Sequence, residues 1–347
     1  MVRCIAALVV GALYSTSAPA EDALLSSGIK LAQQEHYAEA VEVFRQCVMQ
    51  SPRSFEAHYD LALALFALGR LPESREAIEQ IKPLSLDEMA ARNYILGKID
   101  MASGDKVHAR AELSAAFKAR PDDENGAIDY GLFLLHQSDY ATAIATFSRA
   151  KEAHPQSLYV LLGEAIAQAF GGAREDAVLE CRHIIEINPH FAPALLVMAF
   201  AQYISGAYPG AEQTAAAGLR MPSPAPYLYY LHAAALQKMH STEYAAMLSD
   251  LDVAERNLPS CALCYLVRSE IHESAGDIPA AITDLNTLLT RFAPDFDQAW
   301  YRLGGLYRKE GQNSEAQLAF ARVKASLAAS NPELDFARDS LLKQGEK

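Results

Sequence analysis

The stretch Trp300–Phe320 reads WYRLGGLYRKEGQNSEAQLAF and decides the fold of this 347-residue chain. Its residues 300, 303, 304 and 307 have the i, i+3, i+4, i+7 spacing that places four side chains on one face of a helix. Gly311 and the polar residues after it predict a turn. Ala316 and Phe320, four residues apart, predict a second helix that returns against the first. One such hairpin cannot bury its apolar face alone, so the stretch predicts further hairpins stacked beside it.

The pattern recurs at intervals of about 34 residues through most of the chain. Two series of prolines keep this interval. Consecutive prolines are 34 residues apart in the series Pro121, Pro155 and Pro189, and 35 residues apart in the series Pro224, Pro259 and Pro294. A proline cannot continue the helix before it and is tolerated in the first turn of the next helix. We therefore predict about nine repeats, over residues 21–54, 55–88, 90–123, 124–157, 158–191, 192–225, 228–261, 262–295 and 297–328. After Pro332, within residues 329–347, apolar residues at helical spacing predict a last amphipathic helix that caps the stack.

This pattern resembles the tetratricopeptide repeat family, and the resemblance covers residues 21–328. It implies an all-α fold, a right-handed superhelical solenoid of helix-turn-helix repeats whose first helices line a concave groove. Two departures are local. The repeat predicted to start at Leu228 lacks the small residues of the pattern, and the Pro222–Pro226 cluster is expected to open the stack there.

The groove positions that the family implies are unusually apolar in this chain. Because a large uncovered apolar surface usually marks a binding site, we predict a groove for an extended or helical segment of a partner protein. The predicted groove residues are Tyr59, Phe66, Tyr94, Ile128, Leu132, Tyr159, Leu162, Phe170, Leu196, Phe200, Tyr203 and Tyr229. The alternative is that the superhelix closes tightly enough to bury these side chains against one another.

Toward the C-terminal end the corresponding positions become polar, at Glu270, Glu273, Gln298, Arg308 and Lys309. A solvated face explains these charges more simply than contact with a ligand does. Family members that bind Hsp70 or Hsp90 hold a C-terminal carboxylate with Lys, Asn and Arg at fixed groove positions. The fifth positions of the first six repeats here are apolar or aromatic instead, so that carboxylate clamp is absent.

The formal net charge of −13 argues against a nucleic-acid partner, since phosphate binding requires a basic surface. With 51% hydrophobic residues, the composition is that of a core-forming soluble protein.

Residues 1–20 have the order of a secretory signal peptide. Arg3 is followed by an apolar run, and Ala18-Pro19-Ala20 forms a small-x-small cleavage site. The apolar run is much shorter than the ~20 residues that cross a bilayer, which argues against a membrane anchor. We therefore predict an exported protein, periplasmic or secreted, with no membrane span.

Cys261 and Cys264 form the one redox-like motif, placed where a helix is expected to begin. Outside the cytosol the pair is a candidate disulfide. Thiol–disulfide exchange is the functional alternative, although the motif lacks the βαβ context of thioredoxin-like proteins. Cys47 and Cys181 are expected to be buried thiols that act as small apolar residues.

The sequence contains no metal-ligand spacing, phosphate-binding loop or nucleophile elbow. We therefore predict no catalytic residue, no cofactor and no metal. The favoured function is a protein-interaction scaffold. A periplasmic thiol–disulfide accessory that uses Cys261 and Cys264, and a structural or self-associating solenoid, are the alternatives.

Overall fold

The computed structural model describes residues 19–83, 85–258, 260–323 and 341. Except for Pro19 and Ala20, the predicted signal peptide lies outside these residues. The predicted C-terminal helix also lies outside them, except for Leu341, which is buried. Eighteen α-helices and no strand are present in the described part of the chain, which confirms the predicted all-α class.

The chain divides within α9 into two compact units, unit 1 ending at Val160 and unit 2 beginning at Leu161. The helices up to this division are α1 (Pro19–Gln33), α2 (Tyr37–Gln50), α3 (Phe55–Ala67), α4 (Leu71–Glu79), α5 (Leu86–Ser103), α6 (Lys106–Ala119), α7 (Glu124–His136), α8 (Tyr140–Ala153) and α9 (Leu158–Gly171). Those of unit 2 are α10 (Arg174–Ile187), α11 (Ala192–Ile204), α12 (Tyr208–Leu219), α13 (Pro226–Lys238), α14 (Tyr244–Asn257), α15 (Ala262–Ser274), α16 (Ile278–Arg291), α17 (Asp297–Lys309) and α18 (Asn313–Arg322).

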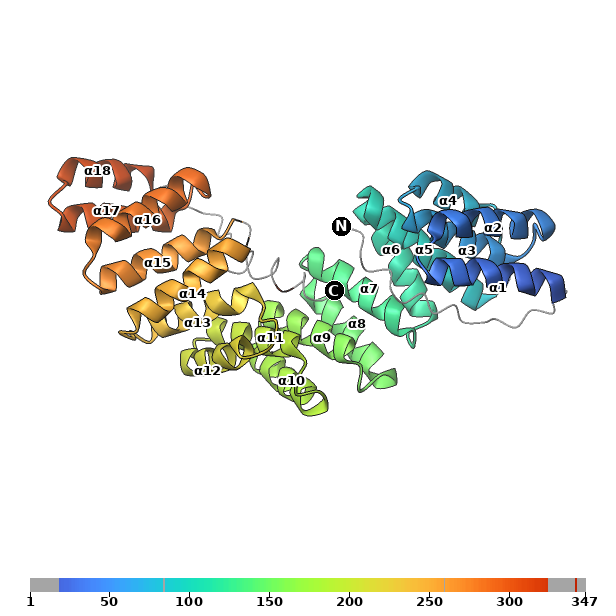
Figure 1. Ribbon diagram of the computed structural model, residues 1–347, viewed down its shortest axis with the longest axis horizontal. Coiled ribbons are helices and arrows are strands. Elements are labelled where there is room, and N and C mark those ends of the chain that lie inside the picture. The colour runs from blue at the N-terminus through green and yellow to red at the C-terminus, as the bar shows by residue number, and fades with distance from the viewer. Residues whose placement is uncertain (1–18, 84, 259, 324–340, 342–347) are drawn as a thin grey trace. The chain divides into compact units, whose positions relative to one another are not determined.

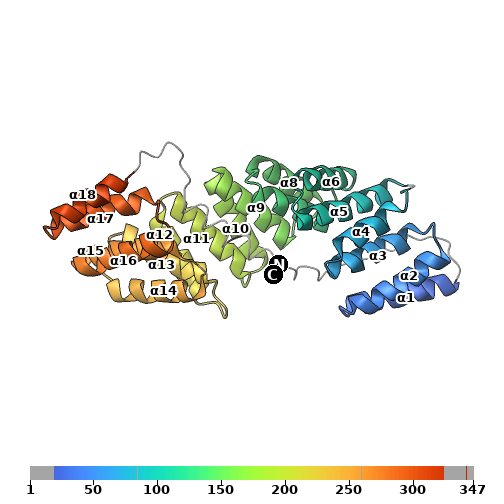
Figure 2. The same ribbon diagram turned by 90° about the horizontal axis from the view of Figure 1, so that it is seen from above.

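Within each unit, helices are paired into hairpins that follow one another in chain order (Figure 1 and Figure 2). In unit 1, α1 packs on α2, α3 on α4, α5 on α6 and α7 on α8. The second helix of a hairpin also packs on the first helix of the next, as α2 does on α3 and α16 on α17. This arrangement confirms the predicted repeat solenoid.

Three of the hairpin turns combine a left-handed residue with an aspartate that caps the second helix. Gly104 (φ 84°) ends α5, and the Asp105 side chain accepts a hydrogen bond from the His108 amide at 3.1 Å, which starts α6. Asp139 and Asp277 cap α8 and α16 in the same way. The turn requires positive φ, and where no glycine is present this conformation is taken by Glu35, Ser138 or His240.

Small residues in the first helix of a hairpin admit the aromatic ring of the second. A Cβ at Gly131 of α7 would lie 2.2 Å from Cζ of Phe147, a fully buried ring of α8. Gly304 of α17 stands in the same relation to Phe320, the last residue of the stretch that predicts the fold. The glycine of the sequence pattern is therefore required by close helix packing.

Unit 2 differs from the prediction around the proline cluster. α13 begins at Pro226, two residues before the repeat start predicted at Leu228, because proline is well suited to the first turn of a helix. When the repeat begins at Pro226, its eighth residue is Ala233, which is fully buried. Ala233 is therefore the small residue of the pattern that a start at Leu228 leaves out. The prediction that the prolines open the stack is wrong, since α13 packs on α11, α12 and α14.

Candidate protein-binding surface

Three first helices of unit 1, α3, α5 and α7, carry partly exposed apolar and aromatic side chains together with one ion pair. We call this surface the α3–α5–α7 face. It consists of Tyr59, Phe66, Tyr94, Lys98, Met101, Ile128, Asp129 and Leu132. Met101 is the most exposed of the apolar members, at 39%. Five of the twelve predicted groove residues are thus brought together here, all of them half-buried.

A polar cluster joins α5 to α7 on this face. The Tyr94 hydroxyl and the Lys98 ammonium both donate to the same oxygen of Asp129, each at 2.5 Å. Lys98 also lies 5.3 Å from the centre of the Tyr94 ring. Burial, and then the charge of Asp129, hold the pKa of Tyr94 well above its ordinary value, so this hydroxyl remains a donor.

The α3 helix contributes a stacked aromatic pair and a buried acid. The rings of Phe55 and Tyr59 lie 5.9 Å apart and nearly parallel. Asp60, which follows Tyr59, is 5% exposed, and its Oδ2 has no hydrogen-bond partner. Burial, with a smaller effect of Glu56, raises the pKa of Asp60 to about 7. The carboxyl of Asp60 therefore gains or loses its proton near neutral pH. Its ionised form destabilises the folded state, because a buried charge without a partner is unfavourable.

In unit 2 the aromatic residues of the first helices bury one another. We call Phe170, Phe200, Tyr227 and Tyr230 the aromatic row. Ring centres are separated by 5.0 Å from Phe170 to Phe200, by 6.5 Å from Phe200 to Tyr227 and by 5.2 Å from Tyr227 to Tyr230. The last three rings are at most 1% exposed. Tilted ring contacts thus connect α9 to α11 and α11 to α13, and the stacked pair extends the row along α13.

The aromatic row corrects the predicted groove in unit 2. Leu162, Leu196, Phe200 and Tyr203 are at most 4% exposed, so a partner cannot contact them without unpacking the helices. The reason is that side chains of this size reach the next first helix, and core burial is more favourable than exposure. The other three groove residues differ, since Phe170 and Tyr229 are half-buried and Tyr159 is 47% exposed.

The charged side chains at the C-terminal end of unit 2 form ion pairs with one another. Glu270 of α15 accepts ion pairs from Lys238 of α13 (3.7 Å) and from Arg302 of α17 (3.2 Å). Glu273 is paired with Arg302 at 2.7 Å and with Lys309 at 2.6 Å. These charges therefore hold three successive first helices together, and they do not present a single sign of charge to a ligand.

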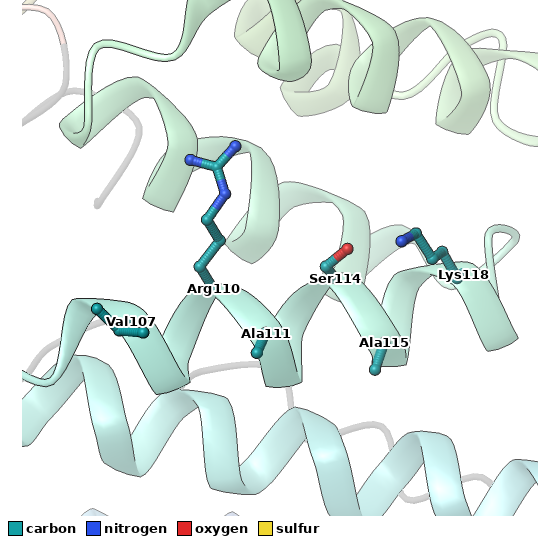
Figure 3. A pocket seen from close by; sticks show the side chains of 6 residues that line it. All are labelled: Val107, Arg110, Ala111, Ser114, Ala115 and Lys118. Carbon is teal, nitrogen blue, oxygen red and sulfur yellow. The ribbon is translucent and has the colours of Figure 1, made fainter.

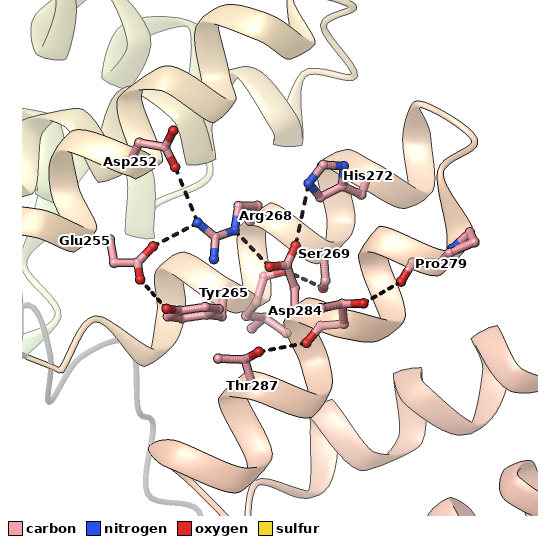
Figure 4. A network of polar contacts seen from close by, with 11 residues as sticks. Asp252, Glu255, Tyr265, Arg268, Ser269, His272, Pro279, Asp284 and Thr287 are labelled. Atoms are coloured by element: carbon pink, nitrogen blue, oxygen red, sulfur yellow. Dashed lines mark hydrogen bonds and ion pairs between the residues drawn. The ribbon is translucent and has the colours of Figure 1, made fainter.

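A second network surrounds Arg268, whose side chain is 15% exposed (Figure 4). Its guanidinium donates to Asp284 of α16 at 2.9 Å and to Glu255 of α14 at 2.8 Å. The group also lies 4.4 Å from the ring centre of Tyr265, whose hydroxyl donates to Glu255. Arg268 thus fastens the helices before and after α15.

Cys261 and Cys264 are joined by a disulfide at the start of α15. Both residues are buried, at 2% and 0% exposure, so a thiolate of another protein cannot reach the sulfurs. The geometry therefore offers no support for thiol–disulfide exchange. Cys47 and Cys181 are buried, as expected, and burial raises the pKa of the Cys181 thiol.

The hollow drawn in Figure 3 lies on α6 and is lined by Val107, Arg110, Ala111, Ser114, Ala115 and Lys118. All six residues come from one helix, and the short side chains between Arg110 and Lys118 create the depression. Arg110 is already paired with Asp139 of unit 1. A depression on a single helix surface lacks the converging walls of a ligand site.

The described helices include none that combines the length and the apolar character of a bilayer-crossing segment. Within the same residues, no group of three or more His, Cys, Asp or Glu side chains is arranged to hold a metal ion.

Models of the tetratricopeptide repeat match residues 31–99, 96–157 and 266–332, more than half of the chain. The chain belongs to the tetratricopeptide repeat family. The matched ranges leave out residues 158–265, which contain the aromatic row. Tetratricopeptide repeat proteins are scaffolds for protein–protein interaction and are generally not enzymes, and this is the class of function that the fold supports.

Similar proteins include Superkiller complex protein 3 of Homo sapiens, 33% identical over 95 residues, and that of Mus musculus, 31% identical over 99 residues. These alignments cover 27% and 28% of this chain but only 6% of each relative. A solved tetratricopeptide repeat protein from Parabacteroides merdae matches 73% of this chain and 99% of its own, with a TM-score of 0.56 and 17% identity. At that identity the likeness concerns the fold alone.

Proposed function

We propose that this tetratricopeptide repeat protein is a scaffold that binds an extended segment of a partner protein on the α3–α5–α7 face. The observation that carries the proposal is the contrast between the two units. The α3–α5–α7 face keeps aromatic and aliphatic side chains partly accessible, whereas four of the predicted groove residues of unit 2, Leu162, Leu196, Phe200 and Tyr203, are at most 4% exposed.

The chemistry of the face suits a peptide segment. Phe66, Met101 and Leu132 offer apolar area from the first helices of three successive hairpins, and Met adapts its shape to different partners. Tyr94 and Tyr59 add rigid contact area at a low cost in conformational entropy. The Lys98–Asp129 pair supplies a donor and an acceptor that a peptide backbone or a polar side chain can use.

The proposed location is outside the cytoplasm, and it rests on the signal-peptide pattern of residues 1–20. The Cys261–Cys264 disulfide is compatible with an oxidising compartment. Edman sequencing of the protein purified from its own cells tests the location, with Glu21 expected as the mature N-terminus. An intact Met1 would contradict export by this route.

The binding proposal is tested with a matched pair of methionines. Peptides selected on the purified protein by display are labelled, and their affinity is measured by fluorescence anisotropy. Met101→Glu, on the α3–α5–α7 face, is expected to weaken binding at least about tenfold, because a charge replaces an apolar contact. Met49→Glu, on α2 and 72% exposed, is the control and is expected to change affinity less than about twofold.

Far-UV circular dichroism establishes that both variants are folded. Equal affinity of the two variants for every selected peptide would exclude the α3–α5–α7 face as the binding surface.

A further inference from the structure

His232 of α13 lies between two carboxylates that belong to different helices. Its Nδ1 is 2.6 Å from Oδ2 of Asp250 on α14, and its Nε2 is 3.6 Å from Oε1 of Glu212 on α12. The side chains of the three residues are 17–26% exposed. All three helices are in unit 2, and α13 also carries Tyr227 and Tyr230 of the aromatic row.

The next hairpin has a permanent cation at the same place. Arg268 is the seventh residue of α15, as His232 is of α13, and its acid Asp284 is the seventh residue of α16, as Asp250 is of α14. Arg268 also contacts the preceding helix, through Glu255 of α14. The chain therefore uses one clamp design twice, once with a guanidinium that is always charged and once with an imidazole that titrates.

We propose that His232 is a pH-sensitive clamp, which when protonated holds α12, α13 and α14 together through Glu212 and Asp250, and which loosens when the ring becomes neutral. A protonated ring has a donor for each carboxylate. A neutral ring keeps one donor only. If Nδ1 donates to Asp250, the lone pair of Nε2 faces Glu212, and the link to α12 is lost.

The electrostatic surroundings favour the charged ring. The hydrogen bond to Asp250, followed by the charges of Asp250 and Glu212, raises the pKa of His232 above its ordinary 6.5 despite partial burial. Because the pKa is higher in the folded state, the stabilisation is fully present below the unfolded value and is lost as the pH rises through the folded value. No charged group of α11 or α15, the other helices packed on α13, contacts His232 in the described residues.

The test is amide hydrogen exchange of the full chain, followed by mass spectrometry at about pH 6 and about pH 7.5. Protection factors are corrected for intrinsic exchange rates. Peptides from α12 and α13 of the natural protein are expected to lose protection about tenfold at the higher pH, the scale of one hydrogen bond to a charged group. His232→Arg, which copies the clamp of α15, is expected to keep high protection at both pH values.

His232→Gln introduces a side chain that is neutral at both pH values. This variant is therefore expected to show low protection of α12 and α13 at both pH values. The proposal is overturned if the natural protein shows no change with pH in these helices, or if the Gln variant keeps the full pH dependence. An NMR titration of the His232 ring gives an independent result, since a midpoint at or below 6.5 would also overturn it.

Discussion

Replacing Phe200 by alanine is expected to lower the free energy of unfolding of unit 2 by about 3–5 kcal/mol, the usual cost of removing a buried aromatic ring. Phe200 is fully buried and has Phe170 on one side and Tyr227 on the other. Loss of its ring therefore removes the contact between three first helices as well as leaving a cavity. Urea unfolding monitored by circular dichroism measures the effect.

The control is Leu179→Ala on α10 of the same unit, where the side chain is 58% exposed. This change is expected to alter stability by less than about 0.5 kcal/mol. An open groove makes the opposite prediction for Phe200, namely a loss of partner binding with stability intact. A cost below about 1 kcal/mol for Phe200→Ala would therefore favour the open groove and contradict the aromatic row.

Alanine at two helical glycines is expected to change stability in opposite directions. Gly131→Ala is expected to cost about 1–3 kcal/mol, because the new methyl group would overlap the buried ring of Phe147. Gly305→Ala is expected to stabilise α17 by up to about 1 kcal/mol, because the added Cβ would meet no atom within 4 Å beyond the local helix backbone, and alanine is the better helix former.

Thermal unfolding of both variants measures the two effects under the same conditions. Gly131→Ala combined with Phe147→Leu is expected to recover part of the loss, since the smaller side chain makes room for the methyl group. A neutral or stabilising effect of Gly131→Ala would show that the helix packing around Gly131 is looser than described.

The hairpins could be predicted because their determinants are local. The apolar spacing of residues 300–307, the turn at Gly311 and the returning helix with Phe320 are specified within one repeat, and close packing makes Gly304 necessary. The register of α13 could also have been found. Pro226 fits the first turn of a helix better than Pro224, and a start there places Ala233 at the small position.

Exposure of the first-helix residues could not be predicted, because it depends on contacts between repeats. Tyr59 and Tyr230 are both the fifth residue of their helix, yet Tyr59 is partly accessible and Tyr230 is 1% exposed. Each tyrosine stacks on a ring of its own helix, Tyr59 on Phe55 and Tyr230 on Tyr227, but Tyr227 also lies 6.5 Å from the ring of Phe200 in the preceding repeat. The sequence of one repeat does not specify how closely the next repeat packs against it.

The His232 clamp was missed for a different reason. The isolated histidine fits no metal or catalytic spacing, and its partners are on two other helices. A signal was nevertheless present. Arg268 with Asp284, one repeat later, occupies the helical positions of His232 with Asp250, so comparison of repeats within the chain would have paired them.

The most direct measurement of the central claim is photo-crosslinking from two equally exposed positions. Benzoylphenylalanine is placed at Met101 on the α3–α5–α7 face or at Met239, the residue directly after α13 in unit 2; the natural side chains are 39% and 38% exposed. With a bound display-selected peptide, we expect an efficient crosslink from position 101 and none above background from position 239. A crosslink from position 239 without one from position 101 would contradict it.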